Sequence, residues 1–321
     1  MIYHRMDIFR PEETGALVFS LDESGTIVSV FDKAINIRVS DRRLVSIVRH
    51  AAAMTPMSVL CPRLLDRGES FGIGQRVSFS DGILAADGWH LDMRGSSRFE
   101  GHPTVDKPFC MDAQKLDLFE KILHFSGQKD GLLGITLDGE PRNRFVGQGR
   151  KIVQKIQTHD TAQLARHLAE FTGLGPGFTP AGDDLISGFL MGEALVQTEH
   201  RLFLDAVPVA RCLMPDTTSK AVLWKAAAGT CDAGRTLIWM ALRRHFPRFL
   251  CRAAAELGRA ETSKDMLAMV THATRYGHTS GTDALTGLLL YFKTRLRHIH
   301  HDRRRIHSPT DVPSKQTSIS G

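Results

Sequence analysis

The sequence predicts an α+β fold in which an N-terminal antiparallel β sheet or barrel precedes a mostly α-helical part. Two observations predict this class. From residue 15 to about residue 105, short runs of β-branched and other apolar residues alternate with turn residues. From about residue 111, apolar residues recur at the spacing of amphipathic helices. The change of period predicts a β-rich domain at 1–110, a helical domain at 111–297 and a disordered basic tail at 298–321.

The predicted strands are short, and polar or turn-forming residues separate them. They cover residues 16–21, 26–31, 35–39, 44–48 and 75–79, with turns at 22–25 and 80–82. Residues 93–107 are rich in glycine, serine, proline and charge, which predicts a linker or a long loop between the two parts of the chain.

The helical part begins with a segment whose apolar residues at 116, 119, 122 and 123 lie on one face. Further helices are predicted at about 160–172, 180–197, 217–229, 233–245, 248–258, 262–275 and 281–297. The segment 129–150 contains six glycine or proline residues, which interrupt any helical or strand periodicity. The sequence therefore predicts no element there.

The charge of the chain gives little support to nucleic-acid binding. The net charge is +6, but residues 293–321 carry seven basic and two acidic side chains, so the rest of the chain is nearly neutral. The five cysteines are widely spaced and form no Cys-x-x-Cys pair, which disfavours a disulfide framework or a cysteine zinc site. No segment has the length of apolar sequence that a membrane helix needs. We therefore expect a cytoplasmic protein that binds neither nucleic acid nor membrane.

The strongest functional signal is Gly-Leu-Gly-Pro-Gly-Phe-Thr-Pro-Ala-Gly-Asp-Asp at residues 173–184. Its closely spaced glycines allow positive φ and a close approach of the backbone to a ligand. Thr179 is a candidate N-cap and Pro180 a suitable first helical residue, so a helix is predicted to start here. Free amides at a helix N-terminus favour an anion. In the competing interpretation this is an ordinary helix start, where Asp183 and Asp184 complement the dipole.

A second loop, Gly-His-Thr-Ser-Gly-Thr-Asp at residues 277–283, repeats this pattern. When Gly281 is aligned with Gly182, Asp283 falls on Asp184 and the later glycines 287 and 188 coincide. In each copy the aspartate and the later glycine share one helix face. We predict that the two helices cross near these later glycines and that both loops converge on one pocket.

The predicted site residues come from these loops and from one further helix start. The predicted catalytic residues are Asp183, Asp184, His278 and Asp283, and the predicted substrate-binding residues are Gly175, Gly177, Thr179, Gly182, Thr279, Ser280 and Gly281. His278 is included because an imidazole can transfer a proton near neutral pH. Thr217, Thr218 and Lys220 are included because hydroxyls and an ammonium at a helix start suit an anion, although a plain cap with a solvated lysine is the simpler interpretation.

Several common cofactors are disfavoured by the spacing of these residues. The first loop lacks the Gly-Lys-Ser/Thr of a phosphate-binding P-loop, and the segment before it is predicted to be a helix rather than the strand of a dinucleotide fold. We therefore predict no cofactor. Mg²⁺ remains open, because it could bridge the carboxylates to a phosphate.

The segment 173–184 resembles the oxamate carbamoyltransferase subunit family, also known as domain of unknown function 2877. The family pattern has leucine at the position of Phe178 and usually serine at that of Ala181. The resemblance continues through the loop at 277–283 and, more loosely, through Phe-Asp-Lys-Ala-Ile-Asn at residues 31–36. It spans roughly residues 15–292.

This resemblance implies a part in carbamoyl transfer during allantoin (purine-nitrogen) breakdown. The implied reaction converts oxalurate and phosphate into oxamate and carbamoyl phosphate, with this chain as one of several subunits. The implied ligands are small carboxylate, carbamoyl or phosphate anions, which suit amide-lined helix starts. The alternative is a non-catalytic assembly or regulatory subunit, in which the glycine loops serve packing or docking.

Overall fold

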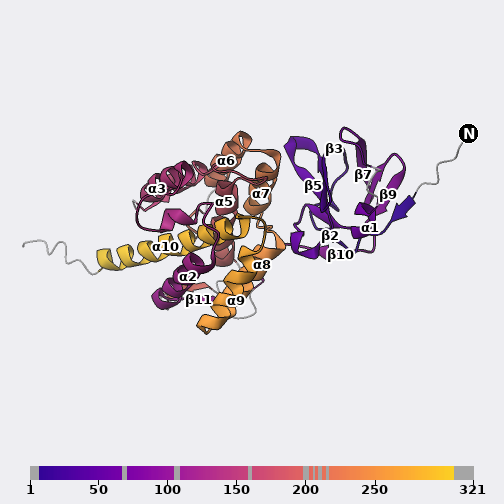
Figure 1. Ribbon diagram of the computed structural model, residues 1–321. Coiled ribbons are helices and arrows are strands. Elements are labelled where there is room, and N and C mark those ends of the chain that lie inside the picture. The colour runs from indigo at the N-terminus through magenta and orange to yellow at the C-terminus, as the bar shows by residue number, and fades with distance from the viewer. Residues whose placement is uncertain are drawn as a thin grey trace, which may run out of the picture.

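The computed structural model describes residues 7–66, 71–104, 109–157, 161–197, 202–204, 207–208, 212–214 and 217–306. A β module (residues 7–104) and a helical module (residues 109–306) lie side by side (Figure 1). Helices α7 (Asp232–Leu242) and α8 (Arg248–Arg259) lie on the helical side of the boundary between them (Figure 1). The predicted α+β class is confirmed.

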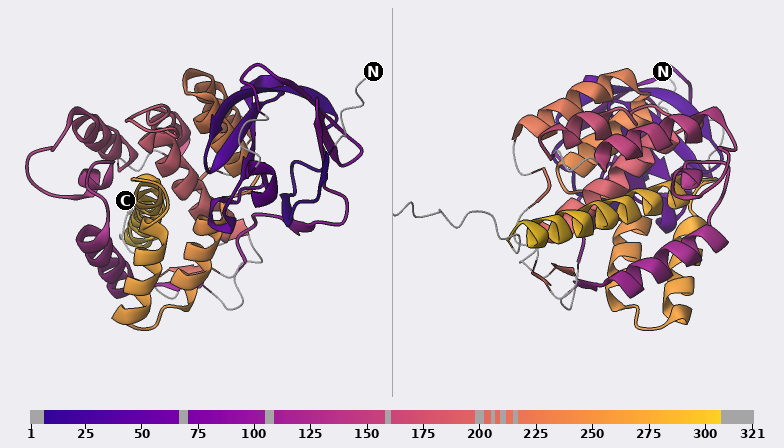
Figure 2. Two further views of the ribbon diagram at one scale, coloured as in Figure 1. Left: turned by 45° about the vertical axis from the view of Figure 1, so that its right-hand side comes forward. Right: turned by 90° about the vertical axis from the view of Figure 1, so that its left-hand side faces the viewer.

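The β module is a curled, mixed sheet, and Figure 2 shows its curl. Its strand order is β1-β9-β8-β7-β3-β4-β5-β6-β2-β10. Most neighbouring strands are antiparallel, as predicted, but β1 and β9, β2 and β10, and β5 and β6 are parallel pairs. The strands are β1 (Asp7–Phe9), β2 (Glu13–Gly15), β3 (Glu23–Phe31), β4 (Ala34–Arg38), β5 (Leu44–Val48), β6 (Ser58–Leu60), β7 (Arg76–Ser80), β8 (Ile83–Ala86), β9 (Trp89–Asp92) and β10 (Ser97–Phe99).

Short helical turns η1 (Ser40–Arg42), η2 (Ala51–Ala53) and α1 (Pro62–Leu65) join some of these strands. Residues 16–20 form turns rather than the predicted strand. The amide of Val18 donates to the carbonyl of Gly15, and the amide of Leu21 donates to that of Val18. The side chains of Val18 and Leu21 are nevertheless buried. The apolar pattern here therefore reflects burial and not extended backbone.

The helical module contains most of the predicted helices near their predicted positions. Its elements are β11 (Phe109–Met111), α2 (Ala113–Ser126), η3 (Leu133–Thr136), α3 (Arg144–Ile156), α4 (Thr161–Ala169), α5 (Ala181–Gln197), β12 (Leu202–Leu204), β13 (Val207–Pro208), α6 (Thr217–Ala226), η4 (Ala227–Gly229), α7, α8, α9 (Ser263–Thr274) and α10 (Ser280–Ile306). None of the helices in the described ranges is both long enough and apolar enough to cross a bilayer.

Helix α3 lies in the segment where the sequence predicted no element. Asn143 caps it by accepting a hydrogen bond from the amide of Val146 at 2.9 Å. Ile152, Val153 and Ile156 are buried on its inner face. The glycine at 149 is needed for close packing, since a Cβ there would lie 2.7 Å from Ile135 Cγ2. Packing of this face therefore outweighs the low helix propensity of the glycines.

The predicted crossing of α5 and α10 is present, and it is reciprocal. A Cβ on Gly188 would lie 1.8 Å from the carbonyl oxygen of Ala284, and one on Gly287 would lie 1.9 Å from that of Leu185. Leu185 and Ala284 are themselves equivalent when Gly182 is aligned with Gly281. The two backbones thus touch at matching positions, as a local two-fold relation requires. This contact fixes the N-terminal ends of both helices close together.

Helix α10 runs across the helical module (Figure 2) and continues to Ile306, nine residues beyond the predicted helix end at 297. The segment 307–321, which forms most of the predicted tail, lies outside the described residues.

The two modules share buried apolar side chains. Leu237 and Met240 of α7 belong to the same core cluster as Ile27 and Ile37 of the sheet. A separate, larger core fills the helical module. Helix α7 therefore serves both modules, and it fixes the β module next to the glycine loops.

Candidate functional site

A cavity of about 530 Å³ lies between the β module and the N-terminal ends of α5 and α10. The β module contributes Lys33, Asn36 and Ser46 to its lining, and the glycine loops contribute Thr179, Asp184 and Ser280. Much of the remaining lining is apolar and comes from α7, from η2 and from the segment that begins α8. The cavity holds polar groups from both modules against apolar walls.

The two glycine loops meet at this cavity through their hydroxyl groups. The Thr179 hydroxyl donates to Asp184 Oδ2 at 3.0 Å. Thr179 Oγ1 and Ser280 Oγ are 3.3 Å apart, although 101 positions separate the two residues. Thr179 therefore turns its hydroxyl to the Asp184 carboxylate, whereas a capping residue would turn it to a backbone amide. The hydroxyls and the carboxylate together form a polar cluster at the cavity wall.

Asp184 is the aspartate that lines the cavity, and only 4% of it is exposed. Burial is the main cause that raises the pKa of Asp184 well above its ordinary value, and the nearby Asp283 carboxyl raises it further. Hydrogen bonds from Ser280 and Thr179 act in the opposite direction. The pKa of the adjacent Tyr276 phenol is also raised, to about 12, mainly by burial. Burial in this corner of the cavity therefore favours the protonated, neutral form of the Asp184 carboxyl over the charged form.

Asp183 does not line the cavity, and its carboxyl connects three segments of the helical module. Its Oδ1 accepts from the Gly173 amide at 2.9 Å, and its Oδ2 accepts from the Thr230 hydroxyl at 2.5 Å. A Cβ on Gly234 would lie 1.9 Å from Oδ2, so α7 packs directly on this carboxyl. Burial raises the pKa of Asp183 to about 6, and the two hydrogen bonds oppose this shift.

Asp283 is fully buried beneath the second loop. Its Oδ1 accepts from the Leu132 amide at 2.6 Å. A Cβ on Gly131 would lie 2.3 Å from Oδ1, so the backbone before η3 covers this carboxyl closely. Its Oδ2 makes no hydrogen bond among the described residues. Burial raises the pKa of Asp283 to about 7. Asp283 does not line the cavity and reaches it only through its electrostatic effect on Asp184.

The predicted glycines serve two different purposes. Gly175 and Gly177 have φ of 93° and 123°, which side-chain-bearing residues rarely adopt, so they shape the first loop. Gly182 and Gly281 lie inside the helices. A Cβ on either would lie 1.9 Å from a carbonyl oxygen of the preceding segment, that of Phe171 or Ala273 respectively. Of these four glycines, only Gly177 lines the cavity.

His278 and Thr279 both line the cavity at its second loop. The His278 side chain is 79% exposed, and its Nε2 lies 3.9 Å from Asp130 Oδ2, which is equally exposed. The imidazole therefore lies in solvent at the edge of the cavity and is not held in one position by buried partners.

Thr217, Thr218 and Lys220 lie elsewhere. They begin α6, and none of them lines the cavity between the modules. Lys220 instead borders a separate cavity of about 30 Å³, next to Leu190 and Glu193 of α5. The structure therefore does not bring this helix start together with the two glycine loops.

Four polar residues of the β module line the cavity but were not among the predicted site residues: Lys33, Asn36, Ser46 and Thr55. Asn36 holds the strands together: its Nδ2 donates to Ser29 Oγ at 2.9 Å, and its Oδ1 accepts from Ser46 Oγ at 2.7 Å. Lys33 is exposed in the turn between β3 and β4. The signal that could have found Lys33 and Asn36 is the segment 31–36, which carried part of the family resemblance.

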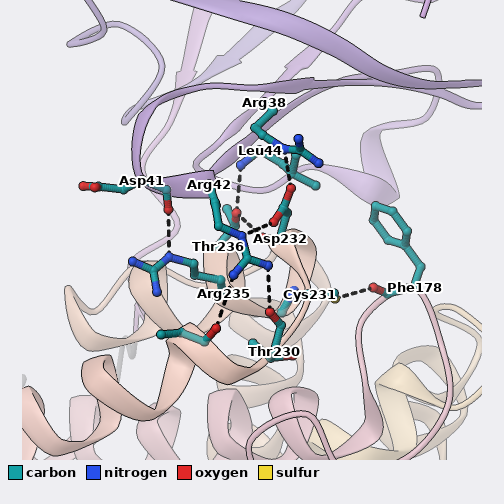
Figure 3. Close-up of polar contacts among 12 residues, drawn as sticks. Arg38, Asp41, Arg42, Leu44, Phe178, Thr230, Cys231, Asp232, Arg235 and Thr236 are labelled. Atoms are coloured by element: carbon teal, nitrogen blue, oxygen red, sulfur yellow. Dashed lines mark hydrogen bonds and ion pairs between the residues drawn. The ribbon is translucent and has the colours of Figure 1, made fainter.

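A polar interface next to the cavity fixes the β module to α7 (Figure 3). Asp232 accepts from Arg38 Nε at 2.5 Å and from Arg42 Nε at 2.7 Å. Arg42 also donates to the carbonyl of Thr230 at 3.0 Å, and the Thr230 hydroxyl binds Asp183. Asp41 and Arg42 both have positive φ, 55° and 59°, which is a strained conformation for these residues.

This interface continues to the first glycine loop. The Cys231 thiol, at the N-cap of α7, donates to the carbonyl of Phe178 at 3.2 Å (Figure 3). The amide of Leu44 donates to the Thr236 hydroxyl at 2.8 Å. The position of the β module is thus connected through short polar contacts to the loop that carries Thr179.

The cavity can hold a small polar molecule among the buried Asp184 carboxyl, the neighbouring hydroxyl groups and Lys33, which all line it. Among the described residues, no group of three or more histidine, cysteine, aspartate or glutamate side chains is placed to hold a metal ion. Both oxygens of Asp183 and one oxygen of Asp283 already have protein donors.

Two family models match the chain. That of the oxamate carbamoyltransferase subunit AllH matches residues 171–292, and that of the AllH family N-terminal domain matches residues 12–98. No curated protein and no solved structure matches the chain significantly. The first matched segment contains both glycine loops, and the second contains the residues of the β module that line the cavity. The chain therefore belongs to the AllH family of oxamate carbamoyltransferase subunits.

Proposed function

We propose that this chain binds the oxamate or oxalurate substrate of a carbamoyltransferase in the cavity between its modules. The observation that carries the proposal is the meeting of Thr179 and Ser280 at the buried Asp184 carboxyl. Oxamate and oxalurate each combine a carboxylate with an amide or carbamoyl nitrogen. A neutral carboxyl flanked by hydroxyls complements the amide end, and the exposed Lys33 in the cavity lining complements the carboxylate.

Asp184 is the proposed catalytic acid. When phosphate attacks the carbamoyl carbon of oxalurate, an oxygen–carbon bond forms and the bond from that carbon to the oxamate nitrogen breaks. The leaving nitrogen then needs a proton. Burial raises the pKa of Asp184 and so favours its protonated form, which can supply that proton. In the reverse direction the same carboxylate accepts the proton.

The other predicted site residues take supporting roles in this proposal. Gly177 and Thr279 place backbone next to the substrate, and His278 lies at the cavity edge, where it can exchange protons with solvent. Asp183 and Asp283 position the loops. No cofactor is part of the proposal. We place the reaction in allantoin breakdown in the cytoplasm, with further protein subunits as partners and with no role for nucleic acid or membrane.

Isothermal titration of the full chain with oxamate and oxalurate tests the proposal. We expect both to bind wild type, and we expect Asp184→Asn to weaken binding and to lower turnover in the assembled enzyme by about 10²-fold or more, because the amide cannot transfer the proton. The fold should survive, since the replacement keeps the size of the side chain. Thr218→Val on α6, away from the cavity, is the matched control.

Two outcomes would contradict the proposal. If the folded wild-type chain binds neither ligand, the non-catalytic assembly role is favoured. If Asp184→Asn retains full turnover in the assembled enzyme, the proton comes from another group, and the role assigned to Asp184 is wrong.

A further inference from the structure

A second cavity, of about 350 Å³, adjoins the first on the far side of Phe249 and Tyr276. These two rings are stacked, with centroids 4.0 Å apart and an angle of 16° between their planes. Both rings, together with Ala53 and Gly277, line both cavities. The stacked pair therefore forms a shared wall, and the second cavity ends beside the loop that carries Ser280.

The lining of this second cavity is strongly basic, unlike that of the first. It includes Arg248, Arg252 and Arg275, with His50 and His272, against the single carboxylate of Glu256. Glu13, which lies outside this lining, pairs with Arg248, so the excess is one positive charge when both imidazoles are neutral. We refer to this cavity as the basic groove.

The ion pairs within the basic groove neutralise only part of its positive charge. Arg248 pairs with Glu13 at 2.5 Å, and Arg252 Nε pairs with Glu256 at 2.6 Å. His272 Nδ1 lies 3.5 Å from the other oxygen of Glu256. Arg275, at the C-cap of α9, makes no ion pair with any residue in the described ranges. Arg275 is exposed and lines the groove, and a guanidinium without a carboxylate partner suits an anion with several oxygen atoms.

We propose that the basic groove is a phosphoryl-binding subsite, which holds inorganic phosphate or the phosphate end of carbamoyl phosphate. This inference rests on the proposed function, because that reaction joins a carbamoyl group to phosphate next to the oxamate site. The groove offers Arg275 to the phosphate, and Arg252 adds positive charge beside it, with its Nε and Nη2 already in contact with Glu256 and His272. Gly277 lines both cavities and lies three positions before Ser280, which lines the first.

Titration of the full chain with inorganic phosphate at low ionic strength tests the subsite. We expect Arg275→Gln to weaken phosphate binding by about tenfold or more, as the loss of a charged hydrogen-bonding partner predicts. Arg252→Gln should weaken it as well, and the double variant should abolish measurable binding. Lys264→Gln is the matched control, because it removes one exposed positive charge from the other end of α9 and does not line the groove.

Oxamate titration of the same samples separates this inference from the proposed function. We expect Arg275→Gln to bind oxamate as wild type does. If wild type binds oxamate but no phosphate, or if Arg275→Gln and Arg252→Gln both bind phosphate as tightly as wild type, the subsite is wrong and the proposed function stands. If wild type binds phosphate but no oxamate, and Arg275→Gln weakens that binding, the subsite stands and the proposed function fails. If wild type binds neither ligand, both are wrong.

Discussion

Three buried aspartates near the N-termini of α5 and α10 show how neighbours give one residue type different roles. Both carboxylate oxygens of Asp183 accept hydrogen bonds from protein donors, which makes it a structural tie. Asp283 has one such donor, and its other oxygen has no partner among the described residues. Asp184 is held only by hydroxyl groups and lines the cavity. Of the three, Asp184 alone lines the cavity, which is why the proposed function assigns the substrate contact to it.

Asp283 predicts a measurable dependence of stability on pH. Its pKa rises from an ordinary value of 3.8 to about 7 in the folded protein, so the folded state binds this proton more tightly than the unfolded state. Its stabilising contribution is therefore complete below about pH 4. It is lost as pH rises towards 7, by at most about 1.4 kcal/mol per pH unit.

Asp283→Asn should remove this dependence, because an amide resembles the protonated carboxyl and can still accept from the Leu132 amide. Urea unfolding at pH 4, 6 and 8 measures the free energy of unfolding. We expect wild type and variant to be similar at pH 4 and the variant to be the more stable at pH 8. A difference that stays constant across this range would show that Asp283 does not titrate there.

At the scale of elements, the crossing of α5 and α10 determines the site. The two helices are in backbone contact at Gly188 and Gly287, and this contact brings the loops before them together. Larger residues at these positions would separate the helix axes. The hydroxyls of Thr179 and Ser280, 3.3 Å apart, depend on that closeness.

Gly188→Ala should therefore destabilise the protein and disturb the site. The new Cβ would lie 1.8 Å from the carbonyl oxygen of Ala284, so the backbones must separate. We expect a loss of about 1–3 kcal/mol or more in the free energy of unfolding, together with weaker oxamate binding. Gly229→Ala is the control, because its Cβ would meet no atom within 4 Å. A Gly188→Ala variant as stable as this control would contradict the crossing.

At the scale of the whole molecule, the site depends on the apposition of two modules. The β module supplies Lys33, Asn36 and Ser46 to the cavity, and the glycine loops supply the opposite polar groups. The modules are joined by the apolar contacts of α7 and by the polar contacts of Asp232 with Arg38 and Arg42 (Figure 3). We infer that the apolar contacts supply most of the free energy that holds the two modules together, and that the polar contacts fix their relative orientation.

Asp232→Ala tests this division of roles. Arg38 and Arg42 are about half exposed, at 52% and 49%, so the ion pairs add little to stability. We expect a loss of about 1–2 kcal/mol in the free energy of unfolding. The affinity for oxamate should fall by more than the loss in unfolding free energy would account for. Amide hydrogen exchange should become faster in the residue 38–44 segment and in the loop at 173–179.

Asp92→Ala is the control, because it breaks the exposed pair with Arg94 inside the β module. It should change neither the oxamate affinity nor the hydrogen exchange of these segments. Unchanged exchange in Asp232→Ala would mean that the apolar contacts alone fix the orientation.

Much of this architecture follows from local patterns that the sequence makes visible. The change from short β runs to helical periodicity predicts the α+β class, and most helices lie near the residues predicted for them. The repeated glycine and aspartate spacing predicts the crossing of α5 and α10, because glycine on a helix face is the direct requirement for backbone contact. The segments 12–98 and 171–292 together carry enough of the family pattern to establish membership from sequence.

Only the tertiary structure decided which polar residues share a cavity. Asp183 and Asp184 are adjacent in sequence, yet successive helix positions point in directions about 100° apart, so one ties segments together and the other faces the cavity. Lys220 fits an anion site by composition but begins a helix that packs elsewhere. Lys33 and the loop at 277–280 line the same cavity, although more than 240 positions separate them in the sequence. They do so because both modules pack against α7 and the helices around it. No local pattern encodes such a meeting, since it results from the burial of apolar surfaces far apart in the chain.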